Sequence, residues 1–124
     1  ELRHRSGDQS ILVRCIPGAI EQILDNLLDN ALAVAPSGSS IDVVIDRIAA
    51  KSVELRVVDH GPGLDDAAKI DAMRRFWRGD TSRPGTGLGL AIVDTLASSS
   101  GGRVVLADTV GGGLTVIVEL PAGE

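Results

Sequence analysis

The sequence has few aromatic residues, one cysteine and no long apolar run. It contains one Phe, one Trp and no Tyr, so the core is expected to be aliphatic and no aromatic surface is available for stacking nucleic-acid bases. The lone Cys15 excludes an internal disulfide. A formal net charge of −5 disfavours a general nucleic-acid-binding protein. No apolar run reaches the roughly 20 residues of a membrane-spanning helix, so no membrane contact is expected from this stretch.

The chain nevertheless has the apolar content of a globular domain. Apolar residues make up 44% of its 124 residues, which is typical of one domain with one core. We therefore predict a single domain over residues 1–124. Residues 1–10 are polar and lack periodicity, which indicates a tail or a domain edge. Residues 11–16 are short and mostly apolar, and predict an edge strand.

An apolar stripe with helical spacing predicts a helix over about residues 17–35. Asn26 and Asn30 are four residues apart and stack on one side of this helix. Asn30 lies roughly 20° from Ile23, at the margin of the stripe. The two amides either bond to neighbouring backbone or turn their carbonyl oxygens to a ligand or a hydrated metal ion. The stripe comprises Ile20, Ile23, Leu24, Leu27, Leu28, Ala31 and Leu32.

Alternating apolar residues predict four more strands, over residues 41–46, 53–58, 103–107 and 114–120. The short link between the first two indicates an antiparallel hairpin. A second amphipathic helix begins near Leu88 and is expected to end before Gly101-Gly102. This order predicts helices packed on one face of a mostly antiparallel sheet.

A carboxylate and two glycines follow the strand over residues 53–58, in Asp59-His60-Gly61-Pro62-Gly63. Asp59 could organise a turn through its own backbone. Because an ionised carboxylate only accepts hydrogen bonds, it could instead bind an exocyclic amine such as that of adenine. In that case the glycines would leave room for a flat ring.

Alternating glycines precede the second helix, in Gly85-Thr86-Gly87-Leu88-Gly89. Backbone N–H groups at the start of a helix suit a phosphate, and glycine lets them approach it closely. The preceding residues 64–84 form a long loop with a local excess of arginine, a length typical of a mobile lid. These arginines are Arg74, Arg75, Arg78 and Arg83.

Four motifs in this order carry a family resemblance: residues 26–31, 59–63, 76–78 (Phe76-Trp77-Arg78) and 85–90. Together they resemble the catalytic ATP-binding domain of sensor histidine kinases, in the superfamily shared with DNA gyrase, Hsp90 and MutL. The resemblance covers roughly residues 17–121. It implies an α+β, two-layer α/β sandwich (the Bergerat ATP-binding fold), with a mixed, mostly antiparallel sheet and a mobile ATP lid over about residues 64–85.

The resemblance also implies individual roles in binding ATP and Mg²⁺. Asn30 matches the asparagine that coordinates magnesium, and Asn26 matches its partner one turn earlier. Asp59 matches the aspartate that accepts from the adenine amine, and Thr115 looks like the threonine that supports it. The other ATP-binding positions implied are Gly61, Gly63, Leu64, Phe76, Arg78, Gly85, Thr86, Gly87, Leu88, Gly89 and Leu90.

For function, the resemblance implies a histidine protein kinase domain that passes the γ-phosphate of Mg-ATP to a histidine on a separate dimerisation domain. A response regulator would act downstream, and the domain would lie on the cytoplasmic side of a membrane-anchored sensor kinase. No phosphoacceptor histidine is matched in the chain, so no catalytic residue is assigned. Autophosphorylation by the isolated chain is not expected.

Two positions depart from the family pattern, and three alternatives stay open. Ala33 and Val34 stand where many histidine kinases have a basic and an aromatic residue. The alternatives are an ATPase of the gyrase type, a serine kinase like those acting on anti-sigma antagonists, and a degenerate nucleotide-binding module. The ATPases carry a glutamate one turn before the magnesium asparagine, whereas Asn26 cannot act as a general base, which favours the kinase.

Overall fold

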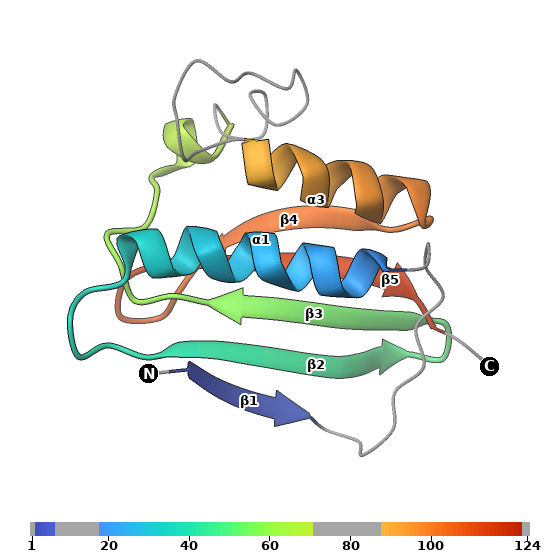
Figure 1. The fold of residues 1–124 in the computed structure, drawn as a ribbon, viewed down its shortest axis with the longest axis horizontal. Coiled ribbons are helices and arrows are strands. Elements are labelled where there is room, and N and C mark those ends of the chain that lie inside the picture. Colours follow the sequence, from blue (N-terminus) through green and yellow to red (C-terminus); the bar gives the residue numbers. More distant parts are fainter. Residues whose placement is uncertain (1, 7–17, 71–87, 123–124) are drawn as a thin grey trace.

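Among the described residues, five strands form one sheet, which is one layer of the fold (Figure 1). The structure is a computed structural model and describes residues 2–6, 18–70 and 88–122. The spatial order is β1-β2-β3-β5-β4, in which β1 and β2 are parallel and the other neighbours are antiparallel. The mixed, mostly antiparallel sheet of the predicted α+β fold is therefore confirmed. The strands are β1 (Leu2–Ser6), β2 (Ile41–Ala49), β3 (Ser52–Val58), β4 (Arg103–Asp108) and β5 (Leu114–Pro121).

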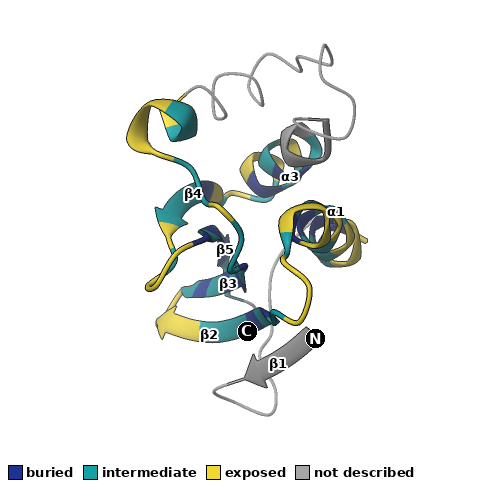
Figure 2. Cartoon of the chain, turned by 90° about the vertical axis from the view of Figure 1, so that its left-hand side faces the viewer, coloured by how far each residue is buried: buried dark blue, intermediate teal, exposed yellow. Residues whose placement is uncertain are grey.

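Two helices, α1 (Ala19–Val34) and α3 (Leu88–Ser99), form the second layer. They lie side by side on the same face of the sheet (Figures 1 and 2). The core lies between the two layers and is aliphatic in the described residues, as the composition predicted. Ile23 of α1, Val93 of α3 and Val118 of β5 are fully buried there. None of the helices in the described ranges is long and apolar enough to cross a membrane.

The predicted stripe of α1 is confirmed over most of its length. Ala19, Ile23, Leu27 and Ala31 are buried at successive turns. The prediction is wrong for Leu32, which is 64% exposed. At about 100° per residue Leu32 lies roughly 180° from Ile23, so it points away from the sheet. Both predicted ends of the helix agree with the structure to within two residues.

Strand burial follows the predicted alternation. Val53, Leu55 and Val57 of β3 are buried, as are Val118 and Leu120 of β5. Strand β3 pairs with β2 in the predicted hairpin. Helix α3 ends as expected at Gly101, whose φ of 87° reverses the chain. Its last carbonyls are satisfied there by the N–H groups of Gly101 and Gly102.

Residues 2–6 differ from the prediction of a polar tail or domain edge, because they form strand β1. This strand pairs with β2 from Leu2–Ile41 to Ser6–Ile45. The pairing satisfies backbone groups that β2 would otherwise expose at the edge of the sheet. The polar side chains of residues 2–6 give no indication of this backbone pairing. The edge strand predicted over residues 11–16 lies outside the described residues.

Candidate functional site

Four segments meet at one end of the sheet, on the left in Figure 1. These are the C-terminal end of α1, the end of β3, the start of α3 and the turn between β4 and β5. Asp59 directly follows β3 and Asn30 lies one turn before the end of α1. The fold thus brings the two polar motifs of the sequence to the same end of the domain.

Asp59 is held by backbone groups from two directions. Its carboxylate is buried, with the residue 5% exposed. Its Oδ1 accepts hydrogen bonds from the N–H of Gly61 at 2.9 Å and from the N–H of Leu114 at 3.1 Å. The N–H of Asp59 in turn donates to the carbonyl of Leu114 at 3.0 Å. Within the described ranges no group bonds to Oδ2, so Asp59 organises the turn with one oxygen and its other oxygen has no partner there.

Three glycines let the surrounding segments close on Asp59. A Cβ at Gly61 would lie 2.8 Å from the carbonyl oxygen of Val34, the last residue of α1. A Cβ at Gly63 would lie 2.8 Å from the carbonyl oxygen of Gly113, and one at Gly113 would overlap the carbonyl oxygen of Asp59. Glycine is therefore required at these positions because backbone from other segments approaches them closely. The sequence suggested a different reason, which was room for a flat ring.

The two asparagines of α1 have different environments. Asn26 donates from Nδ2 to the carbonyl of Gln22 at 2.9 Å, which is the backbone interpretation considered above. The Nδ2 of Asn30 is buried and has no hydrogen-bond partner among the described residues. A buried polar atom without a partner is costly, and the amide O and N can exchange places by a flip. The side-chain amide of Asn26 is therefore bonded to its own helix, whereas the Nδ2 of Asn30 has no partner among the described residues.

The donor set around Asn30 is compatible with a magnesium ion that brings most of its own ligands. The described part of the chain contains no group of three His, Cys, Asp or Glu residues that could hold a metal. Magnesium keeps several waters and is commonly held by one or two protein oxygens together with substrate phosphates. With its amide flipped, Asn30 would offer one amide oxygen for this role.

Thr115 does not support Asp59 in the way that the resemblance implied. Its hydroxyl shares a hydrogen bond of 2.9 Å with the hydroxyl of Thr109. Thr115 pairs with Val58 in the sheet, so the residue opposite Asp59 is Leu114. Because side chains alternate across a strand, Thr115 faces the other side of the sheet from Asp59. Asp59 is held instead by the backbone of Leu114. The run of glycines that precedes β5 was the sequence feature that could have indicated this close backbone contact.

The remaining predicted positions are only partly described. Leu64 is half-buried beside the site, and Leu88, Gly89 and Leu90 form the first turn of α3. A short helix is present over residues 66–70, where Asp65 Oδ1 accepts from the N–H of Ala68 at 2.7 Å. Phe76, Arg78, Gly85, Thr86 and Gly87, together with most of the expected lid, lie outside the described residues.

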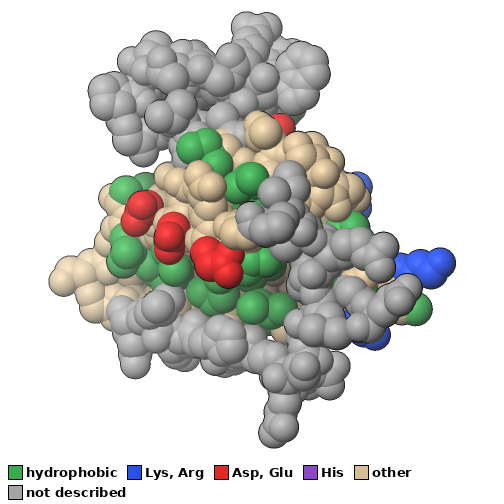
Figure 3. All heavy atoms as spheres, turned by 45° about the vertical axis from the view of Figure 1, so that its right-hand side comes forward, with side chains coloured by type: hydrophobic (Ala, Val, Ile, Leu, Met, Phe, Trp, Pro, Cys, Tyr) green, Lys and Arg blue, Asp and Glu red, His purple; other side chains and the backbone are tan. Residues whose placement is uncertain are grey.

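The charges of α1 lie on its outer side. Glu21, Asp25 and Asp29 are exposed. Figure 3 shows acidic side chains in a row among hydrophobic ones on this side of the molecule. Asn30 lies roughly 140° around the helix from Asp25, at about 100° per residue. The amide is thus separated from the carboxylates that would repel a phosphate.

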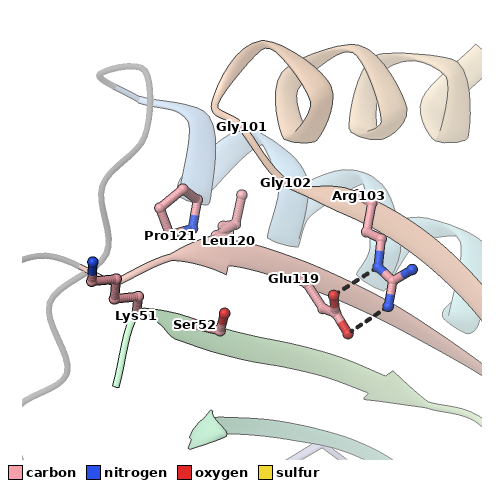
Figure 4. Close-up of a pocket in the computed structure, with 8 residues that line it drawn as sticks. All are labelled: Lys51, Ser52, Gly101, Gly102, Arg103, Glu119, Leu120 and Pro121. Atoms are coloured by element: carbon pink, nitrogen blue, oxygen red, sulfur yellow. Dashed lines mark hydrogen bonds and ion pairs between the residues drawn. The ribbon is translucent and has the colours of Figure 1, made fainter. Parts of the chain in front are cut away.

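A hollow of about 220 Å³ lies at the opposite end of the sheet (Figure 4). It is lined by the start of β3, the end of β5 and the turn after α3. The guanidinium of Arg103 binds both carboxylate oxygens of Glu119 there, at 2.7 and 3.3 Å. This hydrogen bond lowers the pKa of Glu119 and raises that of Arg103. The hollow contains none of the predicted site residues.

Comparison with known proteins gives consistent results. A protein-family model described as "Histidine kinase-, DNA gyrase B-, and HSP90-like ATPase" matches residues 15–124. The sensor protein KdpD of Rathayibacter rathayi is 42% identical over 110 residues, which are 87% of this chain and 13% of that protein. The chain therefore spans a small part of this relative's length.

Solved structures share the fold. The structure of the mycobacterial sensor histidine kinase MprB superposes with a TM-score of 0.77 at 30% identity, covering 98% of this chain and 82% of that one. Full-length ShkA in complex with AMPPNP superposes with a TM-score of 0.81 at 28% identity, covering 99% of this chain and 26% of that one.

Proposed function

The chain belongs to the histidine kinase-, DNA gyrase B- and HSP90-like ATPase family as a histidine-kinase-type catalytic domain, and from this we propose that it binds Mg-ATP through Asp59 and Asn30. It presents the γ-phosphate to a histidine on a separate dimerisation domain. A response regulator then receives the phosphoryl group. The parent protein is a membrane-anchored sensor kinase, with this domain on the cytoplasmic side.

The observation that carries the proposal is the buried carboxylate of Asp59. Its Oδ1 is occupied by two backbone N–H groups, at 2.9 and 3.1 Å, which orient the carboxyl plane. The second oxygen, Oδ2, accepts the exocyclic amine of adenine. Guanine carries a carbonyl oxygen in place of that amine and would be repelled. The structure of ShkA with AMPPNP, an ATP analogue, supports a nucleotide at this fold.

The phosphates lie between α1 and the start of α3. A magnesium ion, when bound, neutralises part of the triphosphate charge. With its amide flipped so that the oxygen takes the buried position, Asn30 would contribute that oxygen to the ion, in place of the Nδ2 that has no partner among the described residues. The first N–H groups of α3 bind the phosphates, and the resemblance assigns Gly85 and Gly87 to the same task. Arg78 adds positive charge to this group.

The chain lacks a base for hydrolysis at the position where the related ATPases have one. Asn26 stands there, and its amide already bonds to the carbonyl of Gln22 in its own helix. An amide does not take a proton from water. The domain therefore holds the nucleotide for an attacking imidazole that another domain supplies, and the isolated chain does not phosphorylate itself.

Titration calorimetry of the 124-residue chain tests this function. We expect ATP to bind in the presence of Mg²⁺, GTP to bind much more weakly, and removal of Mg²⁺ by a chelator to weaken ATP binding. Asn30→Ala is expected to abolish the magnesium dependence, whereas the matched Asp25→Asn on the outer side of α1 is expected to keep it. Absence of ATP binding, or sustained hydrolysis by the chain alone, would contradict the proposal.

A further inference from the structure

The side chain of Lys69 is more buried than is usual for a lysine. The side chain is 15% exposed, although it lies in the short helix over residues 66–70 at the surface. Its ammonium group binds Asp108 Oδ1 directly and lies 3.5 Å from Asp66 Oδ1. The hydrogen bond with Asp108 raises the pKa of Lys69 above its ordinary value of 10.5. The ammonium group is therefore charged at neutral pH and joins two segments that are distant in the sequence.

The partner, Asp108, begins the turn between β4 and β5, and this turn is well ordered by its own bonds. Asp108 pairs with Leu114 across the two strands. The N–H of Thr109 donates to the carbonyl of Gly113 at 3.1 Å, and that of Gly112 donates to the carbonyl of Thr109 at 2.9 Å. The β4–β5 turn, residues 108–114, is therefore a compact unit to which other segments can be anchored.

Asp59 and Lys69 contact this same turn. Asp59 exchanges hydrogen bonds with Leu114 at one end of it, and Lys69 binds Asp108 at the other. Between them, Gly63 packs closely on Gly113. The loop over residues 59–69 is thus held on the β4–β5 turn at its beginning, middle and end.

We propose that Lys69 is a positioning residue for adenine recognition. By anchoring the end of the 59–69 loop to Asp108, it keeps the wall from Gly61 to Leu64 in place and the Asp59 carboxylate oriented. This inference rests on the proposed binding of ATP at Asp59. When the anchor is lost, a smaller fraction of the molecules has the geometry that binds ATP. The apparent affinity for ATP falls in proportion to that fraction.

The test measures ATP affinity by titration calorimetry with Mg²⁺ in the 124-residue chain. Lys69→Met keeps the aliphatic stem and removes the charge. Because the Asp108 carboxylate of this ion pair is 71% exposed, the energy of the pair is modest, and we expect the Kd for ATP to rise about two- to fivefold. Asp108→Asn is expected to give the same increase. Lys51→Met serves as the matched control, since Lys51 is an exposed lysine at the opposite end of the sheet.

A double-mutant cycle separates positioning from general stability. The combined Lys69→Met/Asp108→Asn variant is expected to bind ATP no more weakly than either single variant, and Lys69→Arg is expected to restore most of the affinity. If Lys69→Met lowers the melting temperature but leaves the Kd of ATP unchanged, or if the two losses add, the inference is wrong. If the unmodified chain does not bind ATP, the proposed function itself fails.

Discussion

Replacement of Asp59 by asparagine is the most direct perturbation of the adenine site, because it changes charge without changing shape. The asparagine oxygen can take the place of Oδ1 and accept from the N–H groups of Gly61 and Leu114, now at 2.9 and 3.1 Å. The amide nitrogen then takes the place of Oδ2. It would point a donor at the adenine amine, which is also a donor.

The size of the effect follows from the bond that is lost. A hydrogen bond to a charged group is worth about 1.5–3 kcal/mol, whereas a neutral one is worth about half of that. Loss of the charged bond alone corresponds to a rise in Kd of roughly 10- to 150-fold. The two backbone hydrogen bonds persist, so we expect only a small change in the free energy of unfolding.

Two measurements decide the result. Titration calorimetry gives the Kd of ATP, and thermal unfolding shows whether the fold is kept. Asp25→Asn removes an equal charge from the exposed side of α1 and is expected to change neither value. An unchanged Kd in a folded Asp59→Asn variant would refute the assignment of adenine recognition to Asp59. A variant that unfolds is replaced by Asp59→Glu, which keeps the charge but displaces the oxygens, and which is also expected to bind ATP more weakly.

Three further predictions concern the fold. Leu27→Ala is expected to lower the free energy of unfolding by about 2–5 kcal/mol, because Leu27 is 1% exposed. Leu32→Ala is expected to change it by less than about 0.5 kcal/mol, because Leu32 is 64% exposed. Urea denaturation measures both values, and similar losses in the two variants would contradict the packing of α1. Gly113→Ala is expected to melt well below Gly112→Ala, because both glycines have positive φ (125° and 113°) but only a Cβ at Gly113 overlaps the backbone of Asp59; equal melting temperatures would argue against that close approach. Glu119→Gln is expected to lower the melting temperature at neutral pH but not in acid. The ion pair lowers the pKa of Glu119 below its ordinary value of 4.5, so its stabilisation is present above that value and lost as the pH falls through the folded-state pKa; a difference that persists in acid would contradict this cause.

Periodicity in the sequence predicted most elements of the fold, because it records which face of each element is buried. The alternation of Val53, Leu55 and Val57 was sufficient to predict β3, and the spacing of Ile23, Leu27 and Ala31 to predict α1. Strand β1 could not be predicted in this way. Its residues have no apolar pattern, and its place depends on the backbone groups that β2 offers at the edge of the sheet.

The candidate site was predictable as a set of side chains but not as a set of contacts. Asp59 and Asn30 stood out because a carboxylate at the end of a buried strand and an amide beside a buried stripe both need partners. Thr115 was assigned by likeness to a motif. The register between β3 and β5 places Leu114, and not Thr115, opposite Asp59. The sequence of one strand alone does not show how that strand is aligned with its neighbour.

The sequence by itself determined the elements, the aliphatic core and the identity of the two polar groups, since these follow from local spacing and from the chemistry of single residues. Only the tertiary structure decided how those groups are held. It placed the β4–β5 turn between Asp59 and Lys69, and it left the amide nitrogen of Asn30 buried without a partner among the described residues. The physical reason is that a hydrogen bond or an ion pair between residues far apart in the chain depends on the packing of whole elements, which no local pattern records.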